Sequence, residues 1–145
     1  MKHHALEQLE IVAKVNHDYP RLPMSRRERL ERWAELLEHY PHPALSTLRE
    51  TEYQPAVERA ALRCDHSPIS VAFADPVLRA AGMENDSYGE ARRFFDLTDG
   101  QLHRLVCYCH YGAAVSATTA AHHVRALFTR ENRSLLARLR DFFVG

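Results

Sequence analysis

Hydrophobic residues recur along this chain with the period of an α-helix, and the alternation typical of a β-strand is almost absent. The sequence SRRE, which starts at Ser25, is a capping box: the serine accepts a backbone hydrogen bond and Glu28 reaches back to the helix start. In the helix that this box predicts, four apolar residues share one face. They are Leu30, Trp33, Ala34 and Leu37. Pro41 ends the predicted helix.

Similar signals predict helices along the rest of the chain. Pro68 follows Ser67 and Pro76 follows Asp75, so each proline takes a first helical position behind a capping side chain. Further helices are predicted at about residues 4–18, 44–51, 55–63, 87–96, 99–111, 117–129 and 131–143 from their apolar spacing. The sequence therefore predicts a single all-α domain, residues 1–145, which forms a compact bundle of about seven to nine helices, several of them short.

Two of these helices are expected to form an antiparallel hairpin at residues 99–129. A second capping box opens the first helix at Thr98, and Gly112 ends it. Ser116 or Thr118 caps the second helix. Because the connecting loop is short, the two helices should lie side by side and run in opposite directions.

Composition narrows the classes of protein to which the chain can belong. Its 145 residues carry 19 basic and 19 acidic side chains, and this neutral balance argues against a dedicated nucleic-acid binder. No apolar run approaches the ~18 residues of a membrane span, and the first residues lack the apolar stretch of a signal peptide. The three cysteines do not form the even framework of a disulfide scaffold. We therefore expect a cytoplasmic protein that binds neither membrane nor nucleic acid.

Motifs for nucleotide binding and for common hydrolytic mechanisms are missing from the sequence. It contains no GxGxxG, no GxxxxGKS or GxxxxGKT, no GxSxG and no HExxH. Cys64 and His66 lie close together in RCDHSP, but side chains so near in sequence diverge and seldom form a catalytic dyad. The preferred prediction is a small helical binding or interaction module without catalysis of its own and without a cofactor. The sequence does not identify its protein partner or small ligand.

The stretch CYCHYG at residues 107–112 holds the candidate chemistry. If it continues a regular helix, each residue turns by about 100°, and Cys109 falls on the apolar stripe that starts at Leu102. Cys109 is therefore predicted to be a buried core residue. Tyr108 and Tyr111 point outward on the same helix and are candidate binding residues.

A second stripe of this helix, at the border of the core, holds His103, Cys107 and His110. His123 of the following helix is expected at the same level, so the four side chains can meet. Three histidines and one cysteine form an acceptable set for Zn or Fe, which makes a metal-binding protein or metal-dependent enzyme the alternative function. Haem ligation by one of these four residues is a less favoured version of this alternative. A thiol enzyme centred on Cys107 is the second alternative.

The last predicted helix, residues 131–143, is unusually apolar for the end of a chain. Its large apolar residues are Leu135, Leu136, Leu139, Phe142 and Phe143. Such a helix should either pack back into the core, which we expect, or pair with a second copy. The protein is thus predicted to be a monomer, or a homodimer through the C-terminal helix.

Overall fold

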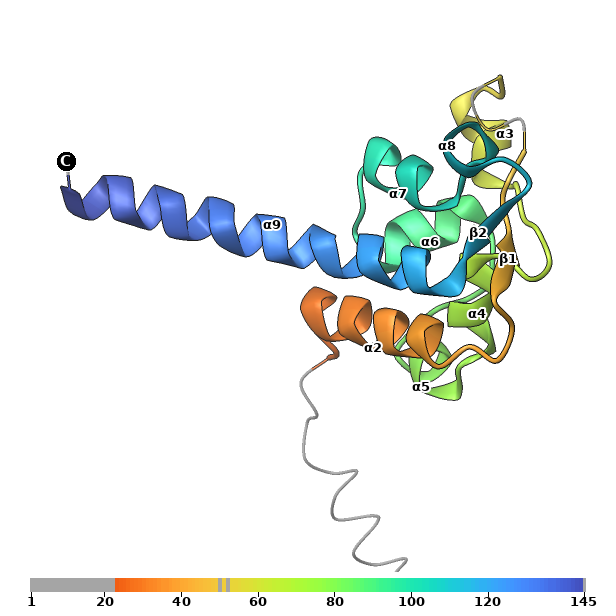
Figure 1. Ribbon diagram of the computed structural model, residues 1–145, viewed down its shortest axis with the longest axis horizontal. Coiled ribbons are helices and arrows are strands. Elements are labelled where there is room, and N and C mark those ends of the chain that lie inside the picture. Colours follow the sequence, from red (N-terminus) through yellow and green to blue (C-terminus); the bar gives the residue numbers. More distant parts are fainter. Residues whose placement is uncertain (1–22, 50, 52, 145) are drawn as a thin grey trace, which may run out of the picture.

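The computed structural model describes residues 23–49, 51 and 53–144, apart from the side chains of residues 132–135 and 141–144. Eight helices and one two-stranded sheet make up this part of the chain (Figure 1). The helices are α2 (Arg26–Glu38), α3 (Ala56–Ala60), α4 (Pro68–Ala74), α5 (Pro76–Ala80), α6 (Tyr88–Phe94), α7 (Asp99–Val106), α8 (Tyr108–Tyr111) and α9 (Ala117–Val144). The strands are β1 (Ala44–Ser46) and β2 (Ala114–Ser116). The predicted helix-dominated fold is confirmed, whereas the helix predicted at residues 4–18 lies outside the described residues.

The capping box at Ser25 forms as predicted and starts α2. The Glu28 N–H donates to Ser25 Oγ at 3.1 Å, and the Ser25 N–H donates to Glu28 Oε1 at 3.4 Å. All four residues of the predicted apolar stripe of α2 are fully buried. At the centre of the core, Trp33 stacks on Phe95 with ring centroids 4.3 Å apart, and its indole N–H donates to the Pro68 carbonyl. The stripe therefore anchors α2 in the hydrophobic core.

The short helices begin where their caps predict. Ser67 caps α4, and Asp75 caps α5 by accepting from the Leu78 N–H. Asp75 also accepts two hydrogen bonds from Arg32 of α2, at 2.8 and 3.0 Å. The capping box at Thr98 opens α7. These caps hold short segments that would not be stable helices alone.

The helix predicted at residues 44–51 does not form in the described residues 44–49. Residues 44–46 form β1 instead, which pairs antiparallel with β2 so that Leu45 lies opposite Val115. Leu48 extends this contact through a bridge to Cys107. The segment is too short and too poorly capped to offset the cost of helix nucleation, whereas β2 supplies backbone partners directly.

The predicted helix at residues 99–111 is broken at Cys107, where the backbone is extended. The Leu48 N–H donates to the Val106 carbonyl at 2.8 Å, and the Tyr108 N–H donates to the Leu48 carbonyl at 2.8 Å. The backbone of Leu48 thus forms hydrogen bonds with the residues on both sides of Cys107. A regular helix would need those groups for its own hydrogen bonds, so α7 ends and α8 starts in a new direction.

The two helices predicted at 117–129 and 131–143 are one helix, α9, of 28 residues. Ser116 caps it by accepting from the Thr119 N–H at 3.0 Å. No proline or glycine interrupts the sequence between Ala117 and Val144, so nothing ends the helix at residue 130. α9 packs against α7, as the predicted hairpin requires.

The last part of α9, residues 131–144, projects from the rest of the molecule, and we call it the arm (Figure 1). In the arm, Leu136 is 64% exposed and Leu139 is 45% exposed. The expectation that this helix packs back into the core is therefore wrong for these described side chains. No helix within the described residues combines the length and the apolar character needed to cross a membrane.

Candidate metal centre

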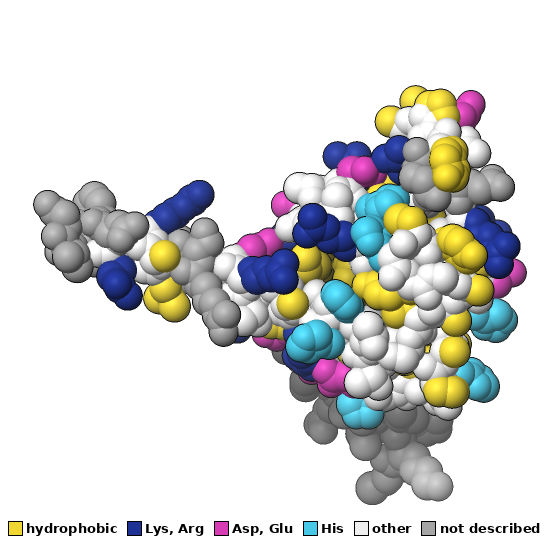
Figure 2. Space-filling model, turned by 45° about the horizontal axis from the view of Figure 1, so that its top comes forward, with side chains coloured by type: hydrophobic (Ala, Val, Ile, Leu, Met, Phe, Trp, Pro, Cys, Tyr) yellow, Lys and Arg dark blue, Asp and Glu magenta, His cyan; other side chains and the backbone are white. Residues whose placement is uncertain are grey.

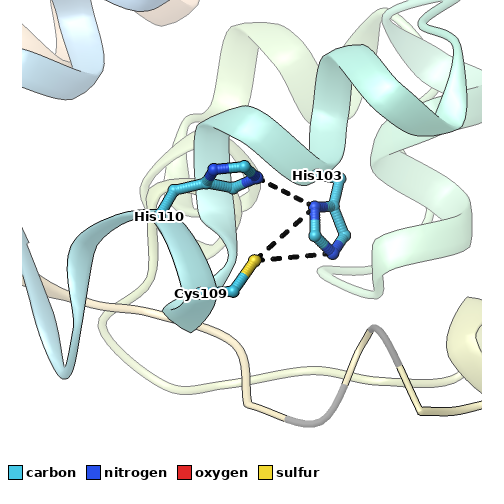
Figure 3. Close-up of side chains that lie close together, drawn as sticks. All are labelled: His103, Cys109 and His110. Carbon is cyan, nitrogen blue, oxygen red and sulfur yellow. Dashed lines mark hydrogen bonds between the residues drawn. The ribbon is translucent and has the colours of Figure 1, made fainter.

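Three potential metal ligands meet at the corner between α7 and α8 (Figure 3). His103 Nδ1 lies 3.0 Å from His110 Nε2, and Cys109 Sγ lies 3.9 Å from both ring nitrogens of His103. One ligand atom from each residue lies within 4.8 Å of the other two. His103 is partly buried, whereas Cys109 and His110 are exposed. The group therefore forms a small cluster of nitrogen and sulfur donors that is open to solvent.

The break at Cys107 creates this cluster. In an unbroken helix, His103 and His110 would be separated by about 10 Å along the axis, because each residue rises by about 1.5 Å. The change of direction after Val106 instead brings α8 back toward α7. Leu48 of the segment after β1 fixes this turn through its two backbone hydrogen bonds. A residue more than 50 positions away in sequence thus positions the two histidines.

The predicted environments of Cys107 and Cys109 are reversed in the structure. Cys107 is fully buried, and its sulfur accepts a hydrogen bond from Thr51 Oγ1 at 2.8 Å. Cys109, which was expected in the core, is exposed and faces His103. The prediction assumed a regular helix, and the extended residue at position 107 rotates all later residues onto other faces. Cys109 therefore replaces Cys107 in the candidate site.

His123 does not belong to the cluster. Its ring packs against Tyr111 with centroids 5.7 Å apart, and the Tyr111 ring in turn packs against His110 at 6.2 Å. Burial, with smaller contributions from the nearby positive charges of His122, Arg130 and His110, lowers the pKa of His123. His123 therefore tends to stay neutral and lines the edge of the site, separated from the donors by Tyr111.

The other predicted residues have structural partners of their own. Tyr108 is 42% exposed and carries the Arg49 guanidinium 5.0 Å above its ring. The Tyr111 hydroxyl donates to the Arg104 carbonyl, and burial raises the pKa of Tyr111. Burial also raises the pKa of Cys64, which disfavours the thiolate that a catalytic cysteine requires.

Two of the three separations within the cluster are close to those expected around a tetrahedral metal ion. Zn–N and Zn–S bonds of about 2.0 and 2.3 Å hold neighbouring ligand atoms roughly 3.3 to 3.6 Å apart. The observed separations of 3.0 Å for the two nitrogens and 3.9 Å for sulfur and nitrogen bracket that range. Small side-chain rotations would therefore bring the three atoms to bonding positions. Three protein ligands leave one coordination position for water or another molecule.

Comparison of the chain with protein-family models, with curated proteins and with solved structures gave no match.

Sequence reasoning found two of the three clustered residues, His103 and His110, and missed Cys109. No signal in the CYCHYG stretch marks the helix break, because the break depends on backbone hydrogen bonds from Leu48. Local spacing alone cannot show such a long-range contact.

Proposed function

We propose that the protein is a metal-binding module that holds one Zn²⁺ ion through His103, Cys109 and His110. The observation that supports this proposal is that donor atoms of two imidazoles and one thiol lie within 4.8 Å of one another at the surface. The fourth position is open to water or to a ligand. The reversible binding of a metal ion at an exposed corner is the function that this geometry favours.

Zinc is the metal that fits the donor set best. A thiolate favours soft or borderline ions such as Zn²⁺ and Cu⁺, and imidazole favours Zn²⁺ together with copper, iron and nickel. Zn²⁺ satisfies both preferences without a redox change and accepts tetrahedral coordination with one open position. Iron remains the weaker candidate because the described cluster lacks a carboxylate ligand.

The geometry does not favour a thiol enzyme centred on Cys107. Cys107 is fully buried and its sulfur accepts a hydrogen bond from Thr51, so a substrate cannot reach the thiol in this conformation. The exposed thiol of Cys109 is adjacent to two histidines, which is the arrangement expected of a metal ligand as well as of an activated cysteine. Binding of a metal ion would occupy this thiol.

Calorimetric titration with Zn²⁺ tests the proposal. After removal of metal by a chelator, the protein should bind one Zn²⁺ per chain, and Cys109→Ser or His103→Ala should weaken binding by about 100-fold or more, since each removes a direct ligand. His39→Ala, at an exposed histidine outside the cluster, is the matched control and should bind as the parent does. His3→Gln with His4→Gln removes the paired histidines near the start of the sequence and should also leave this binding unchanged.

The pH dependence gives a second readout of the same proposal. Protons compete with the metal for imidazole nitrogen and thiolate sulfur. Affinity for Zn²⁺ should therefore fall steeply between about pH 7.5 and about pH 5.5. An affinity that is independent of pH over this interval, or equal binding by the Cys109→Ser protein, would show that the ion binds elsewhere.

A further inference from the structure

The arm exposes an apolar face that continues the side of α9 packed against α2. Leu139 lies 11 residues after Phe128, so the two differ by only about 20° around the helix axis, and Leu136 has the same relation to Arg125. Phe128 contacts the Arg27 guanidinium of α2, and Arg125 pairs with Glu38 of α2. The two exposed leucines therefore point to the side on which α2 lies, but beyond its end.

The N-terminal end of α2 lies where the arm leaves the body (Figure 1). Arg26, in the first turn of α2, forms an ion pair with Glu131, the first residue of the arm. Glu38, at the other end of α2, pairs with Arg125, so α2 runs antiparallel to α9. The N-terminal end of α2 thus lies beside the apolar face that the described residues leave exposed on the arm.

The preceding segment has the length and pattern to cover this face. The helix predicted at residues 4–18 would be about 22 Å long, and the arm of 14 residues is about 21 Å long. Its predicted apolar face contains Leu6, Leu9, and Val12 or Ala13. The residues between it and α2 include Pro20 and Pro23, which allow a bend between two helices rather than one continuous helix.

The charges of the two segments are complementary. Residues 4–18 contain Glu7, Glu10 and Asp18 against one lysine. The arm contains three arginines against Glu131 and Asp141, and Glu131 already pairs with Arg26 of α2. Figure 2 shows arginine side chains along the arm on both sides of its exposed apolar residues. An acidic amphipathic helix therefore fits this face, whereas a second copy of the arm would bring like charges together.

We propose that residues 4–18 form a helix that docks on the arm, antiparallel to α9 and in line with α2. The docked helix covers Leu136 and Leu139 and pairs its acidic side chains with the arginines of the arm. The arm is then an intramolecular docking surface, and its release would expose an apolar helix to other partners.

Hydrogen exchange of the full chain, followed by mass spectrometry, tests this proposal together with the molecular mass in solution. The parent should be monomeric, with slow exchange in residues 4–18. Leu136→Asp with Leu139→Asp should speed exchange in that segment by at least about tenfold and leave the body unchanged. Val57→Asp, at an apolar residue that is 85% exposed on α3, is the matched control and should have no effect on residues 4–18.

Charge reversal gives an independent variant that keeps the apolar residues. Arg138→Glu with Arg140→Glu should loosen residues 4–18, and Glu7→Lys with Glu10→Lys should restore their protection. Fast exchange of residues 4–18 in the parent would overturn the proposal. Protection that appears only with a dimeric mass and at high concentration would also overturn it, because a second copy would then cover the arm.

Discussion

Cys107 and Cys109 are separated by one residue and lie in opposite environments. Cys107 is buried in the core and accepts a hydrogen bond from Thr51, whereas Cys109 is exposed beside two histidines. The two differ because the backbone is extended at residue 107, where α7 ends. One long-range pair of backbone hydrogen bonds, made by Leu48, therefore decides which cysteine stabilises the fold and which is available to a metal ion.

A negative charge at each position should produce the largest difference between the two cysteines. Cys107→Asp buries an uncompensated carboxylate and should lower the free energy of unfolding by about 3–5 kcal/mol. Cys109→Asp places the same group in solvent and should cost less than about 0.5 kcal/mol. Urea denaturation of both proteins measures the difference. Equal stabilities would show that residue 107 is not the buried one.

Removal of the hydrogen bond to Cys107 should have an intermediate effect. Thr51→Val keeps the shape of the side chain but deletes the hydroxyl that donates to the Cys107 sulfur. We expect a loss of about 1–2 kcal/mol in the free energy of unfolding, with no change in affinity for Zn²⁺. Thr118→Val, at an exposed position of α9, is the control and should be neutral. A change in metal affinity without a loss of stability would contradict the assignment of Cys107 to the core and Cys109 to the metal site.

The smallest effect concerns acid sensitivity at the edge of the site. Burial lowers the pKa of His123 below the value of about 6.5 for an exposed histidine. The unfolded chain therefore protonates His123 more readily than the folded protein does. Stability should therefore decline as the pH falls below about 6.5. His123→Gln should reduce this decline in the melting temperature of the metal-free protein. His122→Gln, at the exposed neighbouring residue, should reduce it less.

The sequence was sufficient to predict the elements whose signals are local. The capping boxes at Ser25 and Thr98 and the buried stripe around Trp33 all form as predicted. Each depends on residues within one or two turns of helix. α7 also packs against α9 as the predicted hairpin requires, but α8 and β2 lie between them in the sequence, so the connection is longer than the predicted loop.

The errors in the prediction share a different cause. β1, the break at Cys107 and the exposure of Cys109 all depend on contacts between residues 44–48 and residues 106–116. These contacts satisfy backbone groups that a sequence-based prediction assigns to helices. Because α8 starts in a new direction, the helical faces predicted for residues after Val106 are wrong. Cys109, and not Cys107, therefore lies beside the two histidines.

Absorption spectroscopy with Co²⁺ in place of Zn²⁺ tests the central assignment most directly, because a thiolate bound to cobalt gives a charge-transfer band. The parent, Cys107→Ser and Cys64→Ser proteins should show this band at one equivalent of Co²⁺, and Cys109→Ser should lose it. Loss of the band in Cys107→Ser with its retention in Cys109→Ser, or absence of the band from the parent, would contradict a metal site at His103, Cys109 and His110.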